Sequence, residues 1–196
     1  MARARPFVAS RSKGRPRWED AAVREPYRAV RHGRLDAAEE LAERVADAER
    51  DVVSSVRRQL VHGDFWDNNV FFREGRVVLV TDFDFMGERA RIDDLALTLY
   101  YTNSTFSEDP VSDDRIGRLR RLVDAYDRGL NHPLTQIERA ALPLALARQP
   151  LWWVGRWLAV LDDEERARQG LAGMSGDVEW ALQVMREAGR WQAAFA

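Results

Sequence analysis

The sequence predicts an α+β fold that is mainly helical and contains one small β-hairpin. Over most of the 196-residue chain, apolar residues recur every three or four positions, which is the period of an amphipathic helix. One short stretch instead has the β-branched and aromatic composition of strands, interrupted by a turn signal. Because 45% of the residues are hydrophobic, the chain can bury a core, and its length is that of one domain.

The N-terminal residues divide into a basic arm and a helical region. Residues 1–17 carry six positive charges and no acid, together with Pro and Gly, so we expect a flexible, solvated arm. Contact with nucleic acid is the alternative, but neither interleaved aromatic residues nor an RNA-binding motif accompanies these charges. Residues 18–58 show helical spacing, for example from Leu35 to Ala48, and Asp36 followed by Glu39 resembles an N-terminal cap.

Residues 59–90 have a different pattern and carry the predicted hairpin. Residues 70–72 and 77–81 are β-branched or aromatic runs, and Arg73-Glu74-Gly75-Arg76 between them is a four-residue connection that contains Gly. Two such runs joined by a short link of this kind predict a β-hairpin.

Residues 91–196 return to the helical pattern, which assigns residues 18–196 to one domain with the hairpin in its middle. Thr135 and Glu138 form a capping box, which predicts the start of a helix. Aromatic residues at helical spacing are more often core than ligand-binding, so those of this region are predicted to be buried. The predicted core positions are Ile116, Leu119, Leu122, Val123, Tyr126, Leu130, Trp152, Trp153, Trp157, Trp180, Val184, Ala188, Trp191 and Phe195.

The composition excludes several kinds of site. The chain has no Cys, so it has neither a disulfide nor a Cys-ligated zinc or iron–sulfur centre, and three His residues are too few for a His-rich metal site. Carboxylates must therefore carry any metal chemistry. No apolar run reaches the roughly 18 residues of a membrane-spanning helix, and residues 1–17 lack the apolar stretch of a secretory signal. We therefore expect a cytoplasmic protein without membrane contact.

One group of polar residues has the spacing expected for phosphoryl transfer. His62-Gly63-Asp64 is followed by Asn69, then by the predicted hairpin, and then by Asp82-Phe83-Asp84. Phosphoryl transfer needs one carboxylate that accepts the proton of the attacking hydroxyl. It also needs an Asn oxygen and a second carboxylate that hold Mg²⁺ against the nucleotide phosphates. A loop followed by a hairpin can bring these groups to one edge, and Gly permits close backbone approach there.

These residues resemble the aminoglycoside phosphotransferase family, which has a protein-kinase-like fold and includes choline, homoserine and methylthioribose kinases among its relatives. The resemblance extends to residues 92–96 (Ile-Asp-Asp-Leu-Ala) and to the helical C-terminal region, and it runs from about residue 35 to the end. It implies that Asp64 is the catalytic base and that Asn69 and Asp82 bind Mg²⁺ and the ATP phosphates. Asp94 would brace the loop.

The same resemblance makes His62 and Gly63 structural supports of the site. The residues alone leave an acid/base role for His62 open. Asp84 is either a further contact around the metal or a solvated side chain, and the pattern does not decide between these two readings.

The sequence lacks the N-terminal lobe that the resemblance implies. Members of that family have a strand-rich nucleotide clamp with a strand Lys, whereas only 63 residues precede Asp64 and they contain no Gly-rich phosphate loop. Lys13 is the only Lys of the chain, and it has no strand context. The chain therefore resembles a C-terminal lobe alone, either a truncated kinase or a short member that binds a partner. We expect little or no kinase activity from the isolated chain, and an apolar surface that meets a missing lobe or a second copy in a homodimer.

Two classes of function follow. The first is an ATP-dependent phosphotransferase that transfers the γ-phosphate to a hydroxyl of a small molecule, and the second is a non-catalytic kinase-like interaction module. A metal-dependent phosphohydrolase is the weakest reading, because the extra His and carboxylate ligands of a two-metal site are missing. Acidic clusters at Glu108-Asp109, Asp113-Asp114 and residues 162–165 suit an amine-bearing acceptor, and they equally suit solvated helix starts.

Overall fold

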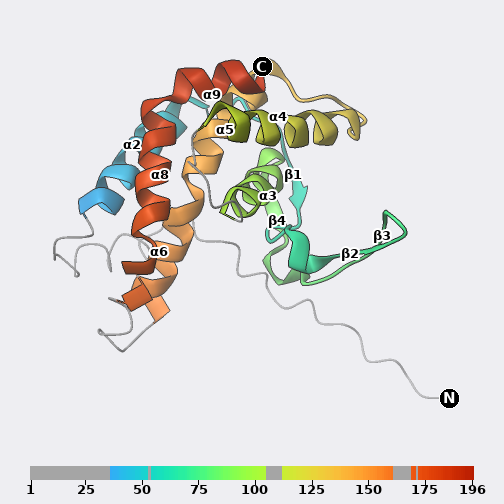
Figure 1. The fold of residues 1–196 in the computed structure, drawn as a ribbon, viewed down its shortest axis with the longest axis horizontal. Helices are drawn as coiled ribbons and strands as arrows, with labels where there is room; N and C mark the ends of the chain where they lie inside the picture. Colours follow the sequence, from blue (N-terminus) through green and yellow to red (C-terminus); the bar gives the residue numbers. More distant parts are fainter. Residues whose placement is uncertain (1–35, 53, 105–111, 161–168, 171) are drawn as a thin grey trace.

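Helices dominate the computed structural model, and its strands form two small antiparallel pairs (Figure 1). This agrees with the predicted α+β, mainly helical class. The structure describes residues 36–52, 54–104, 112–160, 169–170 and 172–196. The basic arm 1–17, residues 18–35 and the acidic clusters at 108–109 and 162–165 lie outside the described residues. Within the described ranges, no helix has both the length and the apolar character needed to cross a membrane.

The described elements follow one another as a helix, a group of short strands, and a series of helices. They are α2 (Asp36–Val52), β1 (Arg58–Val61), the short helix η1 (Asp67–Asn69), β2 (Val70–Arg73), β3 (Arg76–Val80), the short helix η2 (Phe83–Phe85), β4 (Gly87–Ala90), α3 (Ile92–Ser104), α4 (Asp113–Arg128), α5 (Gln136–Ala147), α6 (Gln149–Val160), α8 (Ser175–Arg186) and α9 (Ala188–Phe195). The strands thus lie between the first described helix and the rest of the helical body.

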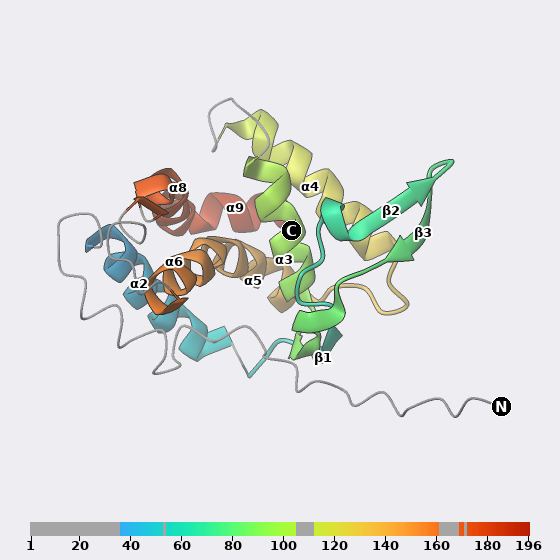
Figure 2. The ribbon, with the colours of Figure 1, turned by 90° about the horizontal axis from the view of Figure 1, so that it is seen from below.

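Helix α5 lies at the centre of the core. It packs against α2, α3, α6, α8 and α9, and most of its residues from 141 to 147 are buried. Helix α2 buries Leu41 and Val45, and it lies beside α6 and α8 on the side of the molecule away from β2 and β3 (Figures 1 and 2). The core is therefore built from helices at both ends of the described chain.

The apolar stripe predicted for α4 is confirmed with one exception. Ile116, Leu119 and Val123 are buried, and Tyr126 is partly buried against the core. Leu122 is 37% exposed, because it precedes Val123 by one residue and so lies about 100° around the helix from it.

The aromatic residues of the last helices differ in burial. Trp180 and Trp191 are buried and meet edge to face, with ring centroids 6.4 Å apart, and Trp191 also packs on buried Phe195. Trp152 and Trp153 are only partly buried, and the Arg156 guanidinium lies over both rings. The predicted burial is therefore confirmed for Trp180, Val184, Trp191 and Phe195, whereas Ala188 and the α6 tryptophans are only partly buried.

Strands β2 and β3 form the predicted hairpin, with a shorter turn than expected. Arg73 pairs with Arg76, so only Glu74 and Gly75 connect the strands. Both have positive φ, 51° and 75°, which is the conformation of a type I′ turn and matches the twist of a two-residue hairpin.

A second strand pair, β1 with β4, was not predicted. Arg58 lies opposite Ala90, and Val61 lies opposite Gly87. Strand β4 reads Gly-Glu-Arg-Ala and contains no β-branched or aromatic residue, so pairing with β1 rather than local preference sets its conformation. The pair brings the segment after β1 next to the segment before β4, which is where the predicted site residues lie.

Two arginines connect the strands to the helices. Arg91 follows β4 directly, is 4% exposed, and forms a bidentate ion pair with Glu138 at 2.6 and 2.5 Å. Glu138 also completes the predicted capping box with Thr135, so that box is confirmed. Arg148 donates to Asp93 of α3 at 2.8 Å and to Glu49 of α2. Burial opposes the charge of Arg148, but the two carboxylates outweigh it and raise its pKa.

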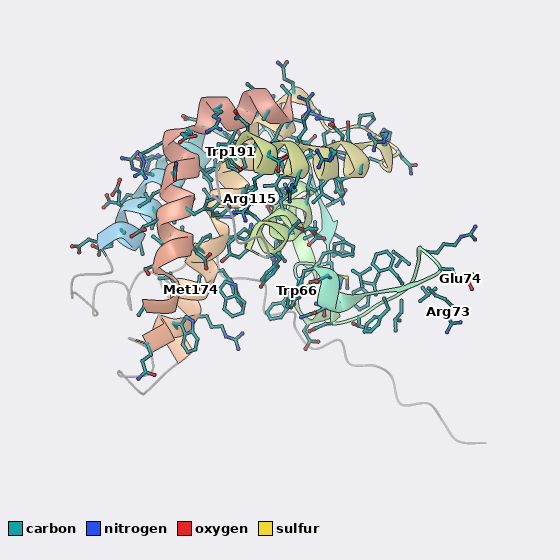
Figure 3. The ribbon with its side chains drawn as sticks, viewed as in Figure 1. Trp66, Arg73, Glu74, Arg115, Met174 and Trp191 are labelled. Atoms are coloured by element: carbon teal, nitrogen blue, oxygen red, sulfur yellow. The ribbon has the colours of Figure 1, made fainter. Side chains whose placement is uncertain are left out.

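The β2–β3 hairpin projects away from the helices and exposes apolar side chains on both faces. Phe72 is 63% exposed and Val77 opposite it is 53% exposed, and Phe71, Val78 and Leu79 are exposed to a similar degree. Figure 3 shows Arg73 and Glu74 at its tip, far from the helical body. A two-stranded hairpin is marginally stable alone, and a contiguous exposed apolar surface of this kind is typical of interaction sites.

Candidate active site

The loop between β1 and β2 contains the first four predicted site residues, from His62 to Asn69, and Asp94 of α3 holds the start of this loop. The two carboxylate oxygens of Asp94 accept hydrogen bonds from the backbone N–H groups of His62 and Gly63, both at 2.7 Å. Asp94 lies in the first turn of α3, where the helix dipole favours a carboxylate. Burial raises the pKa of Asp94 above its ordinary value, although the two N–H donors and His62 act against this. These two bonds hold the backbone at the start of the loop, and the role of Asp94 in a catalytic site stays a prediction.

His62 is held by hydrogen bonds at both ring nitrogens. Its Nε2–H donates to the carbonyl oxygen of Thr81 at 2.8 Å, and its Nδ1 accepts from the backbone N–H of Asp64 at 3.2 Å. Because a carbonyl only accepts and an amide N–H only donates, these partners assign the proton to Nε2. Both nitrogens are used within the protein, so the structure favours a positioning role for His62 over an acid/base role.

Gly63 is required by close packing as well as by backbone conformation. Its φ is +81°, a value that residues with a Cβ rarely adopt. A Cβ at this position would lie 2.2 Å from the carbonyl oxygen of Phe85. The close backbone approach that the sequence suggested is therefore present, and its partner is the segment before β4.

Asp64 and Asn69 contact each other directly. The Asn69 side-chain Nδ2 donates to the backbone oxygen of Asp64 at 2.8 Å and to its carboxylate Oδ2 at 3.1 Å. Asn69 is buried and Asp64 is partly buried. With Nδ2 turned to Asp64, Oδ1 is the acceptor atom that Asn69 can offer to a cation.

Asp82 lies at the same edge, directly after β3. The backbone N–H of its neighbour Thr81 donates to the backbone oxygen of Asn69 at 3.0 Å. The ring centroid of its other neighbour, Phe83, lies 4.9 Å from that of His62. The Asp82 side chain is exposed, and its φ of 61° is in the left-handed region. Non-glycine residues seldom occupy that region, and Asp is among those that do so most often. Asp84, two residues later, is also exposed.

These donors fit a magnesium ion better than a protein-only metal cage. No group of three or more His, Cys, Asp or Glu side chains in the described ranges is placed to hold a metal. Mg²⁺ is usually bound by one or two carboxylates and by substrate phosphates, and it keeps several waters. Asn69 Oδ1 and the Asp82 carboxylate supply oxygen donors of the kind that Mg²⁺ prefers.

Sequence reasoning missed several residues that anchor the loop to α3. The hydroxyl of Thr98 lies 2.9 Å from the carbonyl oxygens of both Phe65 and Asp94. Trp66, at the base of the hairpin in Figure 3, stacks on Tyr101 with ring centroids 4.4 Å apart. Thr98 and Tyr101 follow Asp94 by four and seven residues, so their shared helix face was the available signal.

Arg89 of β4 was also missed. Its guanidinium donates to the Phe85 oxygen at 3.1 Å, next to the Gly63 backbone. Burial lowers the pKa of Arg89, while Asp93 and Asp94 act to raise it. Because β4 was not predicted, nothing in the sequence placed this arginine beside the loop.

Comparison with known proteins places this loop in a family. The profile described as the phosphotransferase enzyme family matches residues 1–132, about two thirds of the chain. This chain belongs to the phosphotransferase enzyme family. The matched part of this phosphotransferase includes the loop, both strand pairs and α3, and it ends before the capping box of α5.

A curated relative of the phosphotransferase is named homoserine kinase, from Phenylobacterium zucineum (strain HLK1). It is 32% identical over 111 residues, which are 55% of this chain and 31% of the relative. The chain thus spans about a third of the length of that relative. No solved structure gave a significant match.

Proposed function

We propose that this chain carries the catalytic loop of an ATP-dependent phosphotransferase that acts on a hydroxyl group of a small molecule. The observation that supports the proposal most is the clamped loop. Asp94 fixes the backbone of His62 and Gly63, and Asn69 fixes Asp64. Phosphoryl transfer depends on positioning and charge stabilisation, and a loop tied at both ends provides the positioning.

In the proposed step, Asp64 acts as the base. The acceptor hydroxyl oxygen forms a bond to the γ-phosphorus, the bond between that phosphorus and the bridging oxygen of ADP breaks, and the hydroxyl proton passes to the Asp64 carboxylate. The Asn69 amide donates to one oxygen of that carboxylate, which helps to hold the Asp64 side chain in position.

The other predicted residues have supporting roles in this proposal. Asn69 Oδ1 and Asp82 would hold Mg²⁺, which neutralises charge on the ATP phosphates when it is bound. His62 and Gly63 keep Asp64 in place through the contacts with Thr81 and Phe85. Asp84 is exposed at the same edge and is a candidate for a further contact around the metal.

We propose a small hydroxyl compound as the acceptor, and homoserine is the first to test because one relative is named a homoserine kinase. The acidic residues do not add support for an amine. Asp113 accepts from Arg190 at 2.6 Å and Asp114 accepts from Arg118 at 2.6 Å, so the described acidic cluster is paired within the chain.

The test uses residues 1–196 with Mg²⁺ and ATP. We expect binding, seen as backbone amide shifts at residues 62–69 and 81–84 in NMR spectra, and little turnover of ATP with or without homoserine. Asn69→Ala and Asp82→Asn should weaken binding, whereas Asp64→Asn should keep it and remove any turnover. Absence of amide shifts in these segments would refute the proposal. Robust ATP turnover that depends on Asp64 would refute the expectation that residues 1–196 have little activity.

A non-catalytic interaction module is the second candidate, and the exposed hairpin favours it. The hairpin presents Phe72 and Val77 largely to solvent, as an interaction surface would. If Mg²⁺ with ATP neither shifts the loop amides nor raises the melting temperature, this second function becomes the better one.

A further inference from the structure

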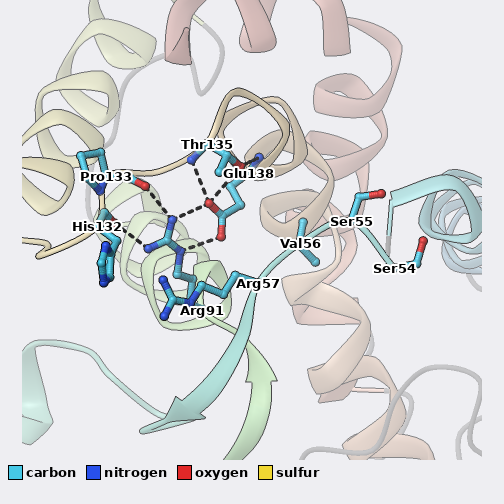
Figure 4. Close-up of a pocket in the computed structure, with 9 residues that line it drawn as sticks. All are labelled: Ser54, Ser55, Val56, Arg57, Arg91, His132, Pro133, Thr135 and Glu138. Atoms are coloured by element: carbon cyan, nitrogen blue, oxygen red, sulfur yellow. Dashed lines mark hydrogen bonds and ion pairs between the residues drawn. The ribbon is translucent and has the colours of Figure 1, made fainter.

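A pocket of about 380 Å³ lies at the opposite end of the β1–β4 pair from the candidate active site (Figure 4). It is lined by residues 54–57 before β1, by Arg91 directly after β4, and by residues of the turn before α5 and of its first turn. Arg57 precedes His62 by five residues of largely extended chain, so the two ends are roughly 16 Å apart. The pocket is therefore separate from the Asp64 loop, and its role does not depend on the proposed function.

The charge of this pocket is positive. Glu138 is the one carboxylate among its lining residues, and its oxygens are taken by Arg91 and by the Thr135 backbone and hydroxyl. Burial of Glu138 would raise its pKa, but Arg91 and Thr135 outweigh this and hold it below the ordinary value, so Glu138 stays ionised. The negative charge of Glu138 offsets the positive charge of Arg91, so the positive charge of Arg57 has no counterpart among the residues that line the pocket.

Arg57 is exposed and forms no ion pair with any described carboxylate. Its backbone oxygen accepts the N–H of Arg91 at 3.0 Å, which fixes the position of its Cα. Figure 4 shows its side chain directed from the start of β1 toward the side of the pocket that holds Arg91 and His132. The guanidinium is thus presented to the pocket on a fixed backbone.

Arg91 has a donor left over in a buried position. A guanidinium carries five N–H groups. In Arg91, Nε binds Glu138, the two N–H groups of Nη2 bind Glu138 and Pro133, and one N–H of Nη1 binds the His132 oxygen. The second N–H of Nη1 has no acceptor among the described residues, although the side chain is only 4% exposed. A buried donor of this kind normally has a water or ligand partner.

We propose that this pocket binds a small phosphate-bearing molecule. Arg57, Arg91 and His132 all line the pocket and carry N–H donors, and the natural partner of such donors is an anion with several acceptor oxygens. The volume exceeds that of a bare phosphate and lies within the range of small-molecule sites, which indicates a phosphate monoester rather than the free ion.

The test measures binding of a phosphate monoester, glycerol 3-phosphate, to the whole chain in EDTA, with no metal present. We expect saturable amide shifts at residues 54–58, 91 and 132–135 in NMR spectra and a rise in melting temperature beyond that in sodium chloride of equal ionic strength. Inorganic phosphate should bind the same residues more weakly. Arg57→Gln should weaken the affinity about tenfold, and His132→Gln several-fold.

Two control variants separate this site from general charge effects. Arg121→Gln removes the same charge from an exposed position of α4, and Asp64→Asn alters the candidate active site, and both should bind like the unaltered protein. The proposal would be overturned if Arg57→Gln bound glycerol 3-phosphate as tightly as the unaltered protein, or if phosphate bound as tightly as glycerol 3-phosphate. Amide shifts centred on residues 62–69, or the absence of a saturable response, would overturn it as well. Arg57 and His132 are exposed, so their variants are expected to fold.

Discussion

Gly63 allows the packing of the candidate active site to be tested at a single residue. Gly63→Ala puts a Cβ 2.2 Å from the Phe85 oxygen at a φ of +81°, so backbone must move. Gly75→Ala is a matched control, because its φ is +75° and its Cβ would have no neighbour within 4 Å. In urea unfolding, we expect a loss of about 1 kcal/mol for Gly75→Ala and about 2–4 kcal/mol for Gly63→Ala. Equal losses would show that the Phe85 contact is unimportant.

Asp94→Asn tests the clamp on the loop. An Asn side chain offers one acceptor oxygen, and its NH₂ group would face the second backbone N–H, so one of the two 2.7 Å bonds is lost. We expect about 1–3 kcal/mol of destabilisation and faster hydrogen exchange at the His62 and Gly63 amides. Asp84→Asn, at an exposed position, should change neither. Unchanged exchange in Asp94→Asn would contradict the clamp.

At the residue scale, the roles of the polar site residues stay predictions, and the sequence indicated that these residues lie close together better than it indicated all the contacts that hold them there. The spacing of Asp64, Asn69 and Asp82 was readable because a loop and a hairpin return the chain to one edge. The roles of Arg89 and Thr98 were not readable, because each depends on where a distant backbone carbonyl lies. Such contacts leave no periodic pattern in the sequence.

The α4–α5 connection is an element whose stability should depend on pH. The backbone N–H of Leu134 and the Arg139 guanidinium hold the pKa of Asp127 below its ordinary value of 3.8. The folded pKa is lower than the unfolded one, so this stabilisation is present above about pH 4 and is lost as the pH falls through the folded pKa.

Asp127→Asn should therefore cost about 1–2 kcal/mol at pH 7 and much less at pH 3. Urea unfolding at the two pH values measures this difference. Asp114→Asn on the same helix removes only an exposed i,i+4 pair with Arg118, and it should cost less than about 0.5 kcal/mol at pH 7. A loss for Asp127→Asn that does not change with pH would contradict the assignment.

At the element scale, the sequence predicted those elements whose formation depends on residues close together in the chain. The capping box at Thr135 and the hairpin around Gly75 are confirmed because both depend on neighbouring residues. Strand β4 was missed because its Gly-Glu-Arg-Ala sequence becomes a strand only through β1. The Arg91–Glu138 pair spans 47 residues and was also outside the reach of local reasoning.

In the whole molecule, the apolar hairpin lies apart from the helical core. Mutations in these two parts should therefore change the free energy of unfolding by different amounts. Phe72→Ser with Val77→Thr removes exposed apolar surface, so we expect less binding of the dye ANS, less self-association, and a stability change below about 0.5 kcal/mol. Leu119→Ala, at a fully buried position of α4, should cost about 2–5 kcal/mol. ANS fluorescence and sedimentation velocity provide the measurements. Undiminished dye binding by the double variant would show that the hairpin is covered.

The packing of α2 also has a consequence for how the chain is made. This helix packs mainly against α5, α6 and α8, all of which follow residue 135. At roughly 5–20 residues per second, a ribosome needs on the order of 4–17 s to go from the end of α2 to the start of α5. During that interval none of these three helices is available to cover Leu41 and Val45. The order of synthesis thus delays the packing of α2 against these helices until the last third of the chain emerges.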